Sequence, residues 1–248
     1  MSENSGTPIS SHNTEKVQQP VVTIPKWEQN ARSRIQTGLR KLVKPTIMLK
    51  ENDAVEADTR HLVTDILCDV LGYDKYENLT AEYSVKGDFA DYGIRIDKQL
   101  VAFVEVKRIS TKLQISHLRQ VESYALKEGV NWAILTNAQI WQAYHIIPVA
   151  GQQSESTLIF EIDLLSDNVK SSLKTDLMFL ISKEGFIRGR ISEYLLTKNA
   201  LSPKTLIPII SSDDVLAAIR REIKKKTKQN VDPKELKLAI SKIVGNSA

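Results

Sequence analysis

The sequence predicts an α/β protein in which a mixed β-sheet is flanked by helices and followed by a helical C-terminal extension. Two observations support this fold class. Residues 54–147 show an amphipathic helix, three short β-type segments, a second helix and two more β-type segments. Beyond residue 166, apolar residues recur at helical spacing. The second helix is expected to be a crossover between strands of the sheet.

The composition is typical of a globular protein. At 248 residues and 42% hydrophobic, the chain is long enough for one full core. No run approaches the ~18 apolar residues of a membrane span, and the N-terminus lacks the basic start and apolar core of a secretory signal. We therefore expect a cytoplasmic protein with no membrane partner. Cys68 is the only cysteine, which excludes disulfides within the chain and cysteine-rich zinc sites.

The basic excess lies in the C-terminal part. Residues 1–150 hold 18 basic and 18 acidic residues, whereas residues 151–248 hold 16 and 12. Much of the excess is the run IRREIKKKTK, whose apolar residues recur at helical spacing. A basic helix face suits a polyanion, although such a run is more often the solvated face of an ordinary amphipathic helix.

The first elements are helical. Residues 1–27 are rich in Ser, Asn, Gln, Thr and Pro and too poor in apolar residues to offset the entropy of ordering, so we expect a disordered tail. A helix is expected from Trp27 to about Leu42, with Pro45 ending it. The next helix covers AVEADTRHLVTDILCDVLG, whose apolar stripe stops at Gly72.

The predicted sheet begins with three β-type segments. The second and third form a hairpin around Asp97-Lys98, and a helix at about residues 116–127 leads to two neighbouring strands, NWAILTN and IWQAYHI. These elements are assigned to one domain over residues 28–165. The region 166–248 is expected to be helical, at roughly 167–181, 189–199, 213–228 and 232–244. The three β-type segments are Leu79–Val85, Phe89–Ile96 and Val101–Val106.

Charged residues end one face of the third β-type segment. Alternation places Val101, Phe103, Glu105 and Lys107 on the same face. Burying such charges without partners costs several kcal/mol each, so partners are expected. Asp91 lies 14 residues before Glu105, on the other strand of the predicted hairpin, so the two carboxylates can approach each other.

Two helices add polar residues to this set. Glu56 lies seven residues before Val63, nearly in line with the apolar stripe of the first core helix. Gln120 and Tyr124 are four apart, so they share one face of the second helix. Each piece alone has an ordinary explanation, such as a cross-strand salt bridge, a turn or cap residue, or an amphipathic surface. Their combination indicates a site.

A divalent metal ion would relieve the repulsion between Asp91 and Glu105. Mg²⁺ prefers oxygen ligands and keeps several waters, so one or two carboxylates and a substrate phosphate suffice. Such an ion lowers the pKa of its water and stabilises charge that builds up on a phosphodiester. Lys107 would then orient or deprotonate that water, or neutralise a phosphoryl oxygen. The pattern predicts a hydrolytic site at the rim of the sheet.

These motifs, in this order, resemble the PD-(D/E)XK nuclease superfamily. The segments EADTRHLV, LTAEYSVKGDFADYGI, VAFVEVKR, HLRQVESYA and WAILTNAQIWQAY are more closely similar to the N-terminal nuclease domain of the restriction (R) subunit of type I restriction enzymes. This resemblance covers about residues 54–147. It implies a restriction-endonuclease-like sheet and a metal-dependent endonuclease that hydrolyses DNA, with Mg²⁺ or Mn²⁺ as cofactor.

The resemblance also implies metal and catalytic roles. Asp91 and Glu105 would bind the metal together with the backbone carbonyl of Val106. Lys107 would be the catalytic lysine, and Glu56 would assist the metal or the water from its helix.

A supporting role is implied for Gln120 and Tyr124, which would match the Q-x-x-x-Y element that supports the site and contacts DNA. The chain departs from the family at the first acidic position, where an alanine stands before Asp91 in place of proline. Asp88 and Asp97 lie near enough in the sequence to be rivals for this position.

No ATP-driven motor is expected in this chain, because the G-x-x-x-x-G-K-[ST] phosphate loop of the type I restriction subunit is absent from the sequence. The expected partners are DNA and other subunits of a restriction or defence complex, and a homodimer stays open. Two other functions also stay open. One is a catalytically silent module that binds nucleic acid or docks a protein, and the other is an RNA-directed nuclease.

Overall fold

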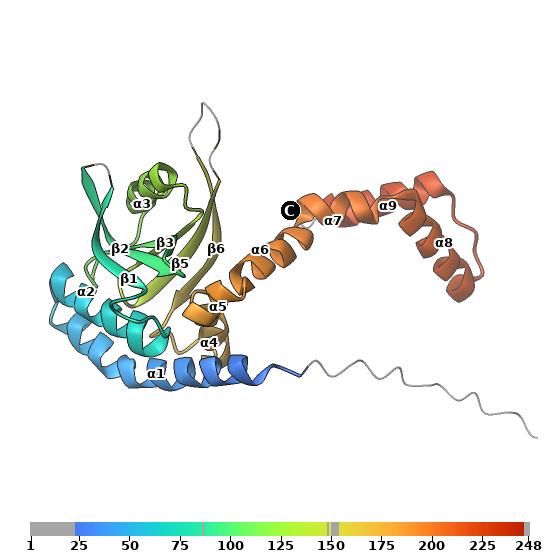
Figure 1. Ribbon diagram of the computed structural model, residues 1–248. Coiled ribbons are helices and arrows are strands. Elements are labelled where there is room, and N and C mark those ends of the chain that lie inside the picture. Colours follow the sequence, from blue (N-terminus) through green and yellow to red (C-terminus); the bar gives the residue numbers. More distant parts are fainter. Residues whose placement is uncertain (1–22, 86, 148, 150–153, 246–248) are drawn as a thin grey trace, which may run out of the picture.

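The computed structural model describes residues 23–85, 87–147, 149 and 154–245, and it shows a twisted sheet with helices on both sides (Figure 1). The strands are β1 Leu79–Val85, β2 Asp88–Ile96, β3 Gln99–Val106, β4 Trp132–Thr136, β5 Ile140–Ile147 and β6 Glu155–Asp163. Within the described residues they form one sheet in the order β1-β2-β3-β4-β5-β6. The predicted α/β fold, with a mixed sheet and a helical C-terminal region, is confirmed.

The hairpin of β2 and β3 turns at the predicted residues. Asp97 and Lys98 both have positive φ, at 49° and 67°, as in the two-residue turns whose twist matches that of the strands. β3 pairs in parallel with β4, while the other neighbouring pairs are antiparallel. A parallel pair needs a crossover, and α3 (Ile115–Glu128) supplies it as predicted.

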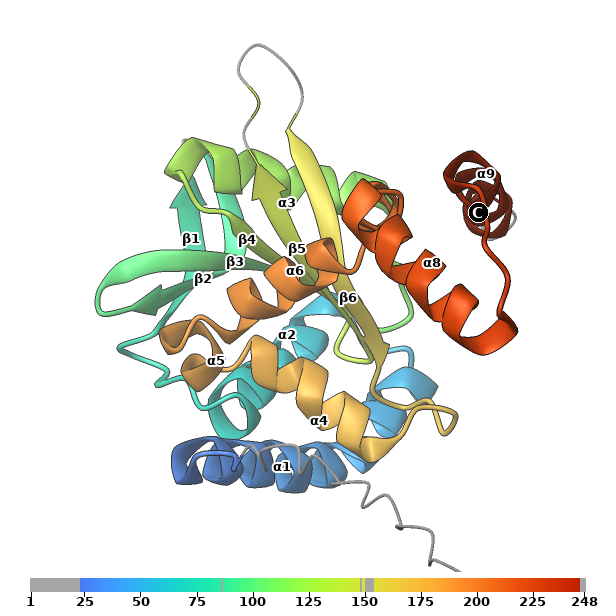
Figure 2. The ribbon, with the colours of Figure 1, turned by 90° about the vertical axis from the view of Figure 1, so that its right-hand side faces the viewer.

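Both faces of the sheet are covered (Figures 1 and 2). Phe103 of β3 belongs to a buried apolar cluster under α3, whereas Val104 belongs to the larger cluster on the opposite face. That face is covered by α1 (Lys26–Glu51), α2 (Glu56–Asp65) and α4 (Ser171–Leu180). Each buried side chain contributes roughly 1.5–3 kcal/mol. The alternation predicted for the third segment is therefore what places β3 at the centre of the domain.

Pro45 does not end the first helix, although the sequence predicts an end near Leu42. α1 continues through Pro45 to Glu51. A proline inside a helix removes a backbone hydrogen bond and costs ~3 kcal/mol. This cost is offset because Leu42 and Leu49 pack against the larger apolar cluster, and because the hydroxyl of Thr46 donates to the carbonyl of Leu42 at 2.7 Å. Tertiary packing outweighs local propensity here.

Three elements are missing from the predicted set: β6, α5 (Lys183–Ile187) and α7 (Pro203–Ile210). β6 pairs with β5 and completes the sheet. The expected disordered tail falls mainly on residues 1–22, which lie outside the described residues, and α1 already begins at Lys26. The other helices fall near their predicted positions. They are a π-helical continuation of α2 (Ile66–Val70), α6 (Arg190–Ala200), α8 (Asp213–Thr227) and α9 (Pro233–Gly245).

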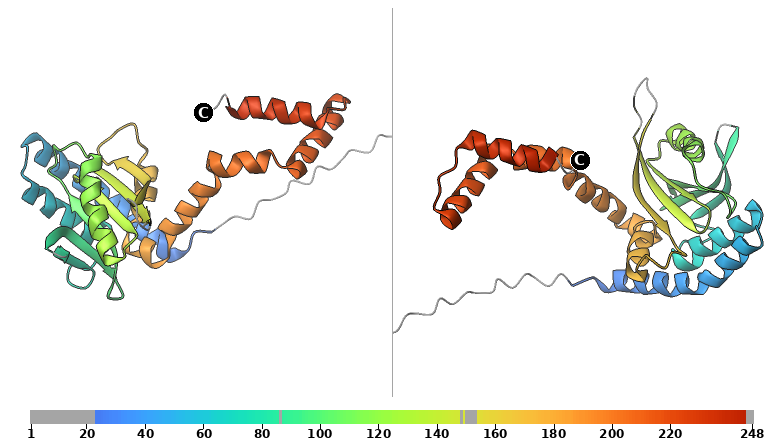
Figure 3. Two further views of the ribbon diagram at one scale, coloured as in Figure 1. Left: turned by 90° about the horizontal axis from the view of Figure 1, so that it is seen from above. Right: turned by 180° about the vertical axis from the view of Figure 1, so that it is seen from behind.

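The C-terminal helices leave the domain as an arm (Figures 1 and 3). Beyond α6, helices α8 and α9 pack on each other through Leu216, Leu236 and Ile240. Arg220 donates to the backbone carbonyl of Val231 at 2.8 Å, so the basic run also ties α8 to the segment before α9. Among the described residues, no helix combines the length and the apolar character that crossing a bilayer requires.

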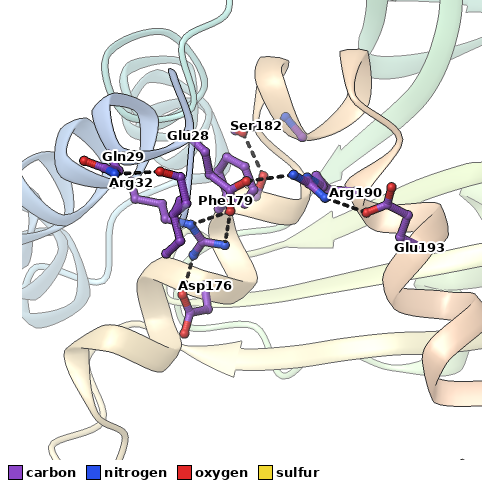
Figure 4. A network of polar contacts seen from close by, with 10 residues as sticks. Glu28, Gln29, Arg32, Asp176, Phe179, Ser182, Arg190 and Glu193 are labelled. Carbon is purple, nitrogen blue, oxygen red and sulfur yellow. Dashed lines mark hydrogen bonds and ion pairs between the residues drawn. The ribbon is translucent and has the colours of Figure 1, made fainter. Parts of the chain in front are cut away.

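An ionic network joins α1 to the helices that follow the sheet (Figure 4). The buried carboxylate of Glu28 binds Arg32 at 2.8 Å and Arg190 at 3.0 Å. Arg32 also pairs with Asp176 of α4, and Arg190 pairs with Glu193 at 2.8 Å. The network therefore holds α1, α4 and α6 together on the face of the sheet opposite α3.

We expect Glu28→Ala to lower the free energy of unfolding by ~1–3 kcal/mol, because two arginines lose the carboxylate that they share. Glu193→Ala is the matched control. Its carboxylate is exposed and binds Arg190 alone, so its loss should change stability by less than ~1 kcal/mol. Urea unfolding followed by circular dichroism measures both. Equal losses in the two variants would contradict the central role of Glu28.

Candidate active site

The ends of β2 and β3 bring the two predicted carboxylates together. Tyr92 and Val104 are the last pair of this antiparallel ladder, and Asp91 and Glu105 are the residues that come directly beyond it on the two strands. Asp91 Oδ2 accepts a hydrogen bond from the backbone N–H of Val106 at 2.7 Å. Both carboxylates line one pocket of about 380 Å³, which we call the catalytic pocket. The hairpin register therefore sets the geometry of the pair.

Lys107 lies in the catalytic pocket beside these carboxylates. Its Nζ donates to Glu105 Oε1 at 2.6 Å and to Gln120 Oε1 at 3.4 Å. The amide of Gln120 in turn donates to the hydroxyl of Tyr124 at 2.9 Å. Gln120 and Tyr124 are one turn apart on α3, so the helix that crosses over from β3 to β4 also positions the lysine.

Glu56 enters the catalytic pocket from the first residue of α2. Within the described part of the chain its carboxylate has no hydrogen bond or ion pair. Its charge raises the pKa of Asp91 and of Glu105, so it lies close enough to act on both. The structure thus brings all six predicted side chains together, while their catalytic roles stay predictions.

Burial raises the pKa of both carboxyl groups. Glu105 is 2% exposed, and desolvation raises its pKa to about 7, opposed by the hydrogen bond from Lys107 and aided by the charge of Asp91. Desolvation also raises the pKa of Asp91, while the N–H of Val106 and the guanidinium of Arg60 oppose the rise. Without a further cation, the pair therefore resists carrying two full charges.

Lys107 stays protonated in this environment. Burial alone would lower its pKa, but the hydrogen bond and the charge of Glu105 together outweigh burial and raise the pKa. A protonated amine can donate a hydrogen bond to a phosphoryl oxygen or neutralise its charge. It cannot accept a proton from water, so of the predicted roles this geometry disfavours deprotonation of the water and fits neutralisation of a phosphoryl oxygen.

The carboxylates offer a site that suits a hard divalent ion. Glu105 Oε2 is buried and has no hydrogen-bond partner among the described residues, although Oε1 of the same group binds Lys107. An unpaired buried oxygen of this kind is costly, and an oxygen-seeking cation next to Asp91 would satisfy it. In the described part of the chain no three His, Cys, Asp or Glu side chains cluster as metal ligands. Mg²⁺ does not need three, because it keeps several waters.

Sequence reasoning missed Arg60, Glu82 and Phe89, which also line the catalytic pocket. Arg60 Nη1 lies 3.3 Å from Asp91 Oδ1 and 3.9 Å from a carboxylate oxygen of Glu82. One signal was available, since Arg60 follows Glu56 by four residues and so shares its helix face. Phe89 is 61% exposed at the rim of the pocket, and no sequence pattern distinguishes it from a core residue of β2.

The rival acidic residues lie elsewhere. Asp88 pairs with Lys127 at 3.1 Å and does not line the catalytic pocket. Asp97 lies in the turn at the far end of the β2–β3 hairpin. The structure therefore favours Asp91 as the first acidic residue.

The site lies within a stretch that matches a known family. Residues 55–158 match the family model of the type I restriction enzyme R protein N terminus. The predicted resemblance to the nuclease domain of R subunits is thereby confirmed over this span, which runs from the start of α2 into β6. The C-terminal helices lie outside the R-protein match. Comparisons with curated proteins and with solved structures gave no match.

A divalent cation is expected to stabilise the protein through the catalytic pocket. At a hundred times its Kd, Mn²⁺ should add ~2.7 kcal/mol to the free energy of unfolding and raise the melting temperature by several degrees. Asp91→Asn and Glu105→Gln should each lose most of this rise. Asp88→Asn, which alters a carboxylate outside the pocket, should keep it. Thermal unfolding in Mn²⁺ and in EDTA measures the effect, and an equal rise in every variant would place the ion elsewhere.

The stabilisation by Mn²⁺ should grow with pH. Because the pKa of Glu105 is raised to about 7 in the cation-free protein, this carboxyl is mostly protonated near pH 6 and mostly ionised near pH 8. An ion that binds the ionised form has to displace a proton at the lower pH, so its apparent affinity is weaker there. We expect the larger rise in melting temperature at about pH 8. Rises of the same size at both pH values would argue against a metal ligand at Glu105.

Proposed function

We propose that this protein is a metal-dependent endonuclease that hydrolyses phosphodiester bonds of DNA. One observation carries the proposal. The buried Oε2 of Glu105 lacks a hydrogen-bond partner within the described residues, and Glu105 lines a pocket together with Asp91 and Lys107. The match to the R protein N terminus supports a nuclease in preference to other metal-dependent hydrolases.

Asp91, Glu105 and the backbone carbonyl of Val106 would hold Mg²⁺ or Mn²⁺, which when bound would supply an activated water and positive charge to the phosphodiester. Contacts within the protein already hold these ligand groups in place. The N–H of Val106 fixes the Asp91 carboxylate, and the hairpin register holds Glu105 beside it. The side chains therefore need little reorganisation to act together.

Lys107 would donate a hydrogen bond to a non-bridging oxygen of the scissile phosphate. Its raised pKa keeps the amine charged, and its partly buried position strengthens the interaction with an anion. Gln120 Oε1 would help to orient the amine, from which it accepts a second hydrogen bond, and the amide of Gln120 donates in turn to the hydroxyl of Tyr124. Glu56, whose carboxylate is unpaired within the described residues, would accept a hydrogen bond from the attacking water.

We further propose that other subunits of a restriction or defence complex work with this chain. The matched family is part of type I restriction enzymes, and the sequence contains no phosphate loop for an ATP-driven motor.

Lys107→Ala and Glu105→Ala should each lower the rate of DNA cleavage by ~100-fold or more while the protein stays folded. Lys127→Ala is the matched control, because Lys127 pairs with the exposed Asp88 outside the catalytic pocket. This variant should cleave DNA at the wild-type rate. Plasmid, linear DNA, single-stranded DNA and RNA would be incubated with Mg²⁺, Mn²⁺ or EDTA, with circular dichroism to verify folding.

Three outcomes separate the candidate functions. Cleavage retained by both pocket variants would remove Asp91, Glu105 and Lys107 from the mechanism. Salt-sensitive binding without cleavage of any nucleic acid would favour a silent binding module. Cleavage of RNA alone would change the substrate and leave the site in place.

A further inference from the structure

A second pocket lies directly beside the catalytic pocket. It has a volume of about 550 Å³, within the range of small-ligand sites, and it shares Arg60, Glu82 and Asp91 with the catalytic pocket. We call it the flanking pocket. Because the two pockets share these residues, a chain molecule that places one unit in the catalytic pocket can place the next unit in the flanking pocket.

The flanking pocket is equipped to bind an anion. Arg60 lines it, and two further basic side chains, His61 and Lys75, line this pocket alone. Both of the latter are exposed, and neither has a hydrogen bond or ion pair among the described residues. The pocket's carboxylates, Glu82 and Asp91, already face Arg60 at 3.9 Å and 3.3 Å. Lys75 is therefore available for an incoming phosphate.

An aromatic residue, Tyr76, lines the same pocket. Tyr76 is 90% exposed, the largest fraction among the exposed large apolar and aromatic residues of the described chain. Its backbone is held in a turn, in which Asp74 Oδ1 accepts from the N–H groups of Tyr76 and Glu77, both at 2.8 Å. Leu79 adds apolar surface to the lining. A ring presented to solvent from an ordered turn, beside basic side chains, is the combination on which nucleobases stack.

A second exposed aromatic lines the catalytic pocket. Phe89 lines the catalytic pocket and not the flanking pocket, and it is 61% exposed. Tyr76 and Phe89 therefore each line one of two pockets that share Arg60 and Asp91. Two neighbouring bases could meet a ring on either side of the phosphate between them.

We propose that the flanking pocket binds an unpaired nucleotide next to the scissile phosphate, with its phosphate on Arg60 and Lys75 and its base stacked on Tyr76. In a duplex, both faces of a base are covered by neighbouring base pairs, so an aromatic ring can stack only on a base that has left the helix. The substrate class is therefore single-stranded or locally unpaired nucleic acid. This inference rests on the proposed nuclease function and narrows its substrate.

Binding to labelled oligonucleotides in EDTA, measured by fluorescence anisotropy, tests the inference without cleavage. The wild-type protein should bind a single strand more tightly than the duplex of the same sequence. Tyr76→Ala should weaken single-strand binding by roughly 5- to 100-fold and leave duplex binding unchanged. Tyr194→Ala is the matched control, since this ring is 38% exposed on α6 and lines neither pocket. An RNA strand of the same sequence shows which nucleic acid supplies the nucleotide.

Lys75→Ala tests the phosphate contact separately. It should weaken binding to both single strand and duplex and reduce the slope of log affinity against log salt by about one. Duplex binding as tight as single-strand binding, or an unchanged affinity in Tyr76→Ala, would overturn the inference. An equal loss by Tyr76→Ala on both substrates would do the same.

Different results would overturn the nuclease function and the binding of a nucleotide in the flanking pocket. Cleavage that depends on Glu105 and Lys107 but not on strand pairing would keep the nuclease and remove the subsite. Single-strand binding that depends on Tyr76, with no cleavage under any metal, would keep the subsite and remove the nuclease.

Discussion

The repulsion between two partly desolvated carboxylates, Asp91 and Glu105, is the constraint to which the surrounding residues of the pocket respond. The hairpin register sets Asp91 beside Glu105. Lys107 satisfies one oxygen of Glu105 and leaves the other without a partner among the described residues. Desolvation raises the pKa of both groups, so further positive charge or a proton would stabilise the pair. A structural salt bridge would have no need of the second carboxylate.

The parts of the site that the sequence predicted all rest on periodicity. Alternation along β3 put Phe103 into the core and Glu105 and Lys107 at its end, and the spacing of four residues put Gln120 and Tyr124 on one face of α3. These relations hold within one helix or strand or across one tight hairpin. The relative positions of the residues are therefore fixed by local geometry and do not depend on how distant elements pack. The type I R-protein match covers all of these elements.

The parts that the sequence did not predict depend on contacts between distant elements. Pro45 stays inside α1 because Leu42 and Leu49 pack on a core whose other members come from the sheet and from α4. α7 begins with a proline, holds a second one, and has a nearly continuous apolar run, so helical periodicity is hidden. The flanking pocket depends most strongly on such contacts between distant elements. It joins α2 to the turn before β1, and the exposure of Tyr76 follows from how that turn lies on the domain.

Under the proposed function, Arg60 would connect the metal chemistry to the recognition of substrate. In the cation-free protein its guanidinium lies 3.3 Å from Asp91 and neutralises part of that charge. A divalent ion held by Asp91 and Glu105 would take over this neutralisation, and Arg60, which lines both pockets, would then have charge to offer a phosphate. Under the proposed function, metal and nucleic acid therefore strengthen each other's binding, and by linkage the coupling is equal in both directions. A basic residue beside the carboxylates is thus compatible with a metal site, because a guanidinium that pairs with Asp91 could pair with a phosphate once an ion is bound.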